Sequence, residues 1–174
     1  MGFSKGFSRD ARGALGARTF SGGLGFRRPV VVLDSGTSYT LTGDQSGVLV
    51  VLNDAFSSGI QINMPADTAA NIGFTCTIVI AVDQTGTFKI ATAANGDIIY
   101  GAIRTQTLTS SNHGAKDEAF QGGGSFDNLI FNADVEGRMA GSVYHVTIAA
   151  SNVLFVEGHG IRTGQTPTTP WSTS

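Results

Sequence analysis

Three histidines and one cysteine are the residues of this chain best suited to catalysis or metal binding. His113, His145 and His159 are separated by 32 and 14 residues, so none stands at metal-ligand spacing from another His or from a Cys. We therefore expect no metal site and no cofactor. His145 falls within an alternating apolar pattern, which favours a hydrogen-bonded residue of a sheet over a ligand.

Cys76 is the only cysteine, so no intrachain disulfide can form. It lies within the most apolar stretch of the chain, where a thiol is usually inert and packs as a small hydrophobe. The motif G-x-S-x-G, which marks a serine nucleophile, is absent. We expect a structural role for Cys76 and no nucleophilic catalysis.

The acidic residues and glycine runs give no specific sign of catalysis either. Any two of the 13 acids could in principle pair for glycan hydrolysis, yet most occupy turn positions that favour Asp for backbone reasons. The runs 22–25 and 122–124 do not match a phosphate-binding loop. The sequence predicts no catalytic residue and a protein that is not an enzyme, with a glycan-cleaving enzyme as a remote alternative.

Charge divides the chain into a basic front and an acidic body. Residues 1–28 hold six Lys and Arg against Asp10 alone, a net charge of +5, whereas the remainder holds five against twelve acids, a net charge of −7. We interpret 1–28 as a glycine-rich N-terminal arm, 29–161 as the folded domain and 162–174 as an extended C-terminal tail that docks as a strap. No apolar run reaches the length of a transmembrane helix, so we expect no membrane partner.

The arm spaces phenylalanines and arginines among glycine and serine, which favours folding against a partner, although a disordered tail remains the alternative. Its cations could contact nucleic acid, although the acidic body would repel DNA, and an acidic protein lattice is an equally good partner electrostatically. We expect apolar plugs and cationic anchors at the following positions: Phe3, Phe7, Arg9, Arg12, Arg18, Phe20, Arg27 and Arg28.

Short apolar runs bounded by turn residues predict about nine or ten strands and no helix between them. Phe74 to Val82 alternates most clearly, and Asn95-Gly96 is a hairpin signal, so 73–104 is expected to form an antiparallel meander. The stretch 109–125 has no period and is expected to be a long surface loop. The fold class predicted is all-β, an antiparallel β-sandwich or jelly-roll-like domain. Strands are expected at 30–33, 48–52, 60–64, 74–82, 88–92, 97–100, 126–132, 143–149 and 153–156.

Several segments of the body resemble capsid decoration proteins, also called head cement proteins, of tailed bacteriophages, particularly those from aquatic hosts. The resemblance covers roughly residues 38–170 and consists of turn-and-strand signatures without catalytic content. It is carried by LTGDQSGVLVVL (41–52), INMP (62–65), IGFTCTIVI (72–80), TGTFKIATAANGDIIYGAI (85–103) and GRMAGSVYHVTIAASNVLFVEGHGIRTG (137–164).

This resemblance implies a homotrimer on the capsid exterior of the virion that binds the major capsid protein between capsomers and stiffens the head. Similar modules occur in phage fibres, so a tail or head fibre module that binds a host receptor or glycan is the alternative. A sugar-binding fibre tip should display clustered aromatics. The chain has one Trp and three Tyr, most of them in or near predicted strands, which favours the decoration protein.

Overall fold

The computed structural model describes residues 20–21, 25–26, 28–93, 98–107, 117–122, 128–132, 137–163 and 171–172, and for strands β1, β2, β10 and β14 it describes the backbone alone. Strands dominate, and the helices of these ranges are two 3-10 turns, η1 (Gly43–Gln45) and η2 (Ala69–Asn71). The strands are β1 (Phe20–Ser21), β2 (Gly25–Phe26), β3 (Val30–Leu33), β4 (Ser38–Thr40), β5 (Val48–Leu52), β6 (Ile60–Asn63), β7 (Thr75–Ile80), β8 (Phe88–Ala91), β9 (Ile98–Thr107), β10 (Asp117–Gly122), β11 (Asn128–Phe131), β12 (Val143–Ala150), β13 (Val153–Arg162) and β14 (Trp171–Ser172).

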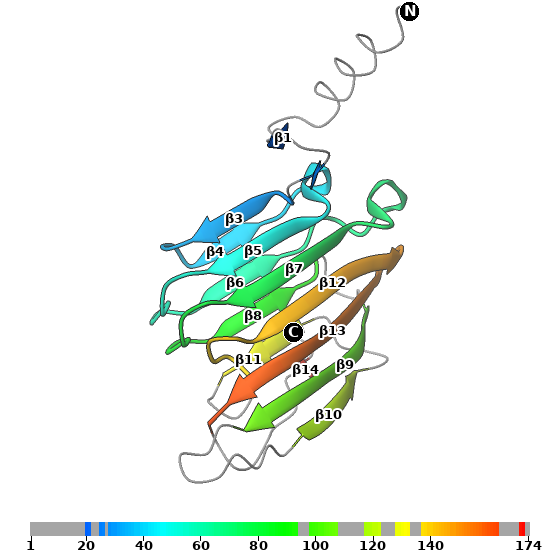
Figure 1. Ribbon diagram of the computed structural model, residues 1–174. Helices are drawn as coiled ribbons and strands as arrows, with labels where there is room; N and C mark the ends of the chain where they lie inside the picture. Colours follow the sequence, from blue (N-terminus) through cyan, green and yellow to red (C-terminus); the bar gives the residue numbers. More distant parts are fainter. Residues whose placement is uncertain are drawn as a thin grey trace, which may run out of the picture.

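These strands form two large mixed sheets and one small ribbon. The seven-stranded sheet has the order β10-β9-β13-β12-β7-β5-β3, and the five-stranded sheet has the order β14-β11-β8-β6-β4. Strands β1 and β2 pair only with each other among the described residues. Figure 1 shows the strands of the larger sheet running from β3 at one edge to β9 and β10 at the other. The molecule is therefore all-β.

In the first half of the body, the chain passes back and forth between the two sheets. Each pair of strands, one from each sheet, forms one coil, and the coils stack on one another. Each odd strand from β3 to β7 lies in the seven-stranded sheet, and each following even strand lies in the five-stranded sheet. Successive coils pair in parallel, so Val31, Val50 and Ile78 align across β3, β5 and β7. Ile62 and Ile90 align in the same way across β6 and β8. Such stacking places like residues above one another and buries them as continuous apolar columns.

The core lies between the inner faces of the two sheets. Val50, Ile78 and Ile90 are completely buried there. Three aromatic rings join the sheets, because Tyr144 of β12 lies 4.8 Å from Phe131 of β11 and 5.9 Å from Phe88 of β8, measured between ring centroids. Burying side chains of this size supplies roughly 1.5 to 3 kcal/mol each. The packing between sheets therefore accounts for stability without a disulfide.

The body is not antiparallel throughout as expected, because both large sheets mix parallel and antiparallel pairs, and the meander expected over 73–104 is wrong. Strand β7 pairs in parallel with β5, and β8 lies in the other sheet, in parallel with β6. Strand β9 pairs with β10 and β13, so β8 and β9 do not form the hairpin expected around Asn95-Gly96. The apolar runs VVVL (30–33) and VLVVL (48–52) are typical of buried parallel strands. In this protein they pair in parallel between stacked coils and do not form hairpins.

The stretch 109–125 also differs from the expected loop. It contains β10, which pairs with β9 over six residues in antiparallel register from Asp117↔Gln106 to Gly122↔Gly101. Pairing with β9 allows this segment to form a strand, although its local sequence has no strand pattern. In the predicted C-terminal tail, Trp171–Ser172 forms β14 and pairs with β11.

Candidate functional site

Most of the predicted arm contacts lie outside the described residues. These are Phe3, Phe7, Arg9, Arg12, Arg18 and Arg27. Phe20 belongs to β1, where its backbone pairs with that of Phe26. Arg28 is described in full, and it marks the point at which the arm joins the body.

Arg28 fixes the end of the arm to the outer face of the seven-stranded sheet. Its Nε donates to the carbonyl of Gly47 at 2.6 Å, and its Nη2 donates to Oγ1 of Thr77 at 2.6 Å. The Thr77 hydroxyl lies 3.0 Å from Nδ1 of His145. Since this hydroxyl accepts from Arg28, it can donate its own proton to Nδ1 of a neutral histidine. His145 is thus a hydrogen-bonded sheet residue, as predicted, and Arg28 binds the protein's own body.

The outer face of the same sheet carries a row of valines. Val32, Val51, Val79 and Val143 align across β3, β5, β7 and β12. Val32 is 54% exposed, and Val30, one pleat away on the edge strand, is 55% exposed. We call these five residues the valine row. Apolar side chains left exposed together on a sheet commonly mark an interaction surface.

The same outer face holds a shallow depression of about 390 Å³, farther from the edge strand β3. It lies over β9, β13 and β12, and four of its side chains are charged or titratable and exposed, namely Arg104, His145, Glu157 and His159. We call it the sheet-face depression. The register explains the grouping, because Arg104 aligns with His159, and Glu157 lies between Ala102 and His145. It is lined by Ala102, Arg104, Val143, His145, Phe155, Glu157, Gly158 and His159.

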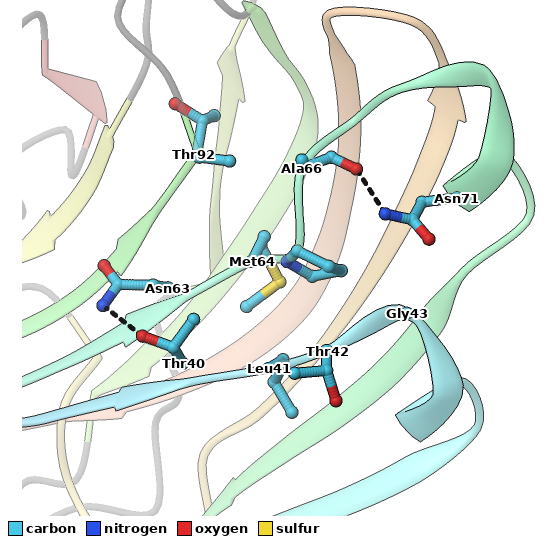
Figure 2. A pocket seen from close by; sticks show the side chains of 11 residues that line it. Thr40, Leu41, Thr42, Gly43, Asn63, Met64, Ala66, Asn71 and Thr92 are labelled. Atoms are coloured by element: carbon cyan, nitrogen blue, oxygen red, sulfur yellow. Dashed lines mark hydrogen bonds between the residues drawn. The ribbon is translucent and has the colours of Figure 1, made fainter.

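A second pocket, of about 470 Å³, lies where β4, β6 and β8 end (Figure 2). Leu41 and Met64 contribute apolar surface. Its amide side chains are engaged within the protein: Asn63 Nδ2 donates to Oγ1 of Thr40 at 3.2 Å, and Asn71 Nδ2 donates to the carbonyl of Ala66 at 2.6 Å. We call it the coil-end pocket. These bonds hold turns together and explain the polar side chains without a ligand.

The remaining candidates for chemistry are structural. Cys76 is buried, its Sγ lies 3.9 Å from Sδ of Met64, and burial raises its thiol pKa to about 12, an effect that the nearby Arg28 charge partly opposes. Tyr144 donates to the carbonyl of Gly137, and burial raises its pKa as well. Within the described ranges, no three His, Cys, Asp or Glu side chains gather to hold a metal ion, and no helix is long and apolar enough to cross a membrane.

Sequence reasoning missed the sheet-face depression. Alternation within 100–104 and within 155–159 places Tyr100 and Arg104 on one face, and likewise Phe155, Glu157 and His159. Their meeting depends on the parallel pairing of β9 with β13, two strands about fifty residues apart in the sequence. No local signal specifies that pairing.

In comparisons with known proteins, no family model, no curated protein and no solved structure matches the chain.

Proposed function

We propose that this protein is a structural component of a phage virion, a decoration protein that binds the outer surface of the capsid and stabilises the head. The observation that carries the proposal is that the valine row begins beside Arg28, where the basic arm joins the body. Val30 and Val32 lie on the edge strand β3, two and four residues after Arg28. One edge of the body therefore combines exposed apolar surface with the start of a cationic segment.

An edge of this kind suits docking against another protein. Within the part of the chain that the structure describes, strand β3 pairs only with β5, and no other strand pairs with its outer edge. Exposed apolar edge strands pair readily with further chains, and a soluble protein normally blocks or covers them. The major capsid protein, or another copy within a homotrimer on the capsid exterior, would provide that cover.

The arm is expected to add cationic anchors to this apolar contact. Its net charge of +5 complements an acidic lattice, and the acidic body disfavours nucleic acid as the partner. Because Arg28 binds Gly47 and Thr77 of its own domain, the capsid anchors are better sought among Arg9, Arg12, Arg18 and Arg27. The two-layered body we class with β-sandwich modules, and within this proposal it serves as a rigid support without catalysis.

The test is binding to heads that have been stripped of this protein. Full-length protein should saturate stripped heads stoichiometrically, and a variant lacking residues 1–27 but keeping Arg28 should bind at least tenfold more weakly. The shortened variant should unfold at the same urea concentration as the full chain, because the Arg28 bonds are retained. Failure of both forms to bind heads, together with co-purification with tails, would contradict the proposal and favour the fibre alternative.

A further inference from the structure

The sheet-face depression lies over β9, β13 and β12, and it meets the inner end of the valine row at Val143. Its strands, β9 and β13, are paired in parallel over ten residues from Val153↔Ile98 to Arg162↔Thr107. β12 pairs with the other side of β13. Side chains on such a continuous ladder are held more firmly than side chains on a loop. The depression is therefore a preformed surface.

Its charged side chains are not engaged with one another. Within the described part of the chain, the side chains of Arg104, Glu157 and His159 take part in no hydrogen bond or ion pair, although they lie on neighbouring strands. A guanidinium supplies only donors and a carboxylate only acceptors. Arg104 and Glu157 are diagonal neighbours across β9 and β13, and they therefore present a donor set and an acceptor set to the same depression.

Aromatic rings border these polar groups. Phe155 and Tyr100 are aligned across β13 and β9, and each is 42% exposed. Phe155 lines the depression, two residues before Glu157 on the same face of the strand. Flat apolar rings beside hydrogen-bonding groups suit a ligand that has an apolar face and a polar rim.

The combination discriminates among ligand classes. A phosphate or carboxylate would lie against Glu157, and a cation would lie against Arg104, so each would meet a like charge. A pair of neighbouring hydroxyls donates and accepts at once, and so satisfies both side chains. The C–H face of a pyranose ring covers an aromatic ring.

From this arrangement we propose that the sheet-face depression binds neutral saccharides through a vicinal diol. Glu157 accepts hydrogen bonds from the diol, Arg104 donates to it, and Phe155 packs against the sugar ring. His145, whose Nδ1 faces Thr77, and His159 border the same depression. The three residues that contact the sugar in this proposal, Arg104, Phe155 and Glu157, lie outside the arm and the valine row, and Val143 is the one residue that the valine row shares with the lining of the depression.

The proposal is tested by titrating the full-length, isotopically labelled protein with methyl glycosides of glucose, galactose and mannose, and following backbone amide shifts. At least one neutral glycoside should shift the amides of Ala102, Glu157 and Gly158, with a dissociation constant on the order of 1 mM for one ring on an open surface. Phe155→Ala and Glu157→Gln should each weaken binding at least fivefold, while Phe155→Tyr should retain it.

Val32→Ala is the matched control, since Val32 is an exposed apolar residue of the same face, outside the depression. It should leave saccharide binding unchanged. The proposal is overturned if no neutral glycoside shifts these amides, or if the shifts map to the coil-end pocket. It is also overturned if methyl glucuronide or inorganic phosphate binds more tightly than the neutral sugars, or if Val32→Ala weakens binding as much as Phe155→Ala does.

Discussion

Gly158 leaves room for the ring of Tyr144: a Cβ at Gly158 would lie 2.5 Å from Cδ1 of that ring and 2.7 Å from the carbonyl of Val143. Gly160 also leaves room for Tyr144, since a Cβ at Gly160 would lie 2.8 Å from the tyrosine hydroxyl oxygen. The alternating glycines of EGHG (157–160) thus face the core, while Glu157 and His159 face outward. These four residues therefore contribute to two features: the glycines make room for Tyr144 in the core, and Glu157 and His159 line the sheet-face depression.

Gly158→Ala should lower the free energy of unfolding by about 2 to 3 kcal/mol, because the new methyl group must displace either the Tyr144 ring or backbone. Urea denaturation measures the effect. Gly73→Ala is the control: Gly73 has a φ of +86° but no atom within 4 Å of its Cβ position, so it should cost only about 1 kcal/mol of backbone strain. Equal losses in the two variants would contradict the contact between Gly158 and Tyr144.

Stability should fall in alkaline solution through Cys76. Burial raises its thiol pKa from 9.0 to about 12, so the folded state holds a proton that the unfolded state releases. The stabilising contribution is complete below pH 9 and is lost as the pH rises toward 12. Between pH 8 and pH 10 the wild type should lose roughly 1 kcal/mol more than Cys76→Ala, as measured by urea unfolding. Parallel pH profiles for the two proteins would argue that the thiol is not desolvated.

The hydrogen bond from Arg28 to Thr77 should stabilise the attachment of the arm's C-terminal end to the seven-stranded sheet. Arg28→Ala should cost about 1 kcal/mol, the usual value of a hydrogen bond in a partly exposed site. A double-mutant cycle with Thr77→Val should give a coupling energy of about 0.5 to 1 kcal/mol. Strict additivity of the two substitutions would show that the bond contributes nothing.

Val32→Lys should reduce binding to stripped heads at least tenfold, because it places a charge in the valine row. The folded state should change by no more than about 0.5 kcal/mol, since Val32 is half exposed at a sheet edge. Ile72→Lys is the matched control, because Ile72 is 49% exposed and lies outside both sheets. If both variants bind heads as the wild type does, the valine row is not the docking edge.

The sequence by itself determined where several of the core strands lie. The alternation in 74–82 and the β-branched runs at 30–33 and 48–52 are local patterns, and β7, β3 and β5 occupy those positions. It also indicated a buried, inert Cys76 and a hydrogen-bonded His145, because each lies within a strand pattern. Local side-chain periodicity is sufficient for conclusions of this kind.

Only the tertiary structure decided which strands are neighbours. Each connection among β3, β4 and β5 crosses between sheets, and a short turn sequence does not distinguish such a crossing from a hairpin. The parallel pairing of β9 with β13 brings Arg104 beside His159 and Tyr100 beside Phe155. Strand pairing depends on burial of the whole face against the other sheet, so the sheet-face depression and the valine row emerge only when all the strands are assembled.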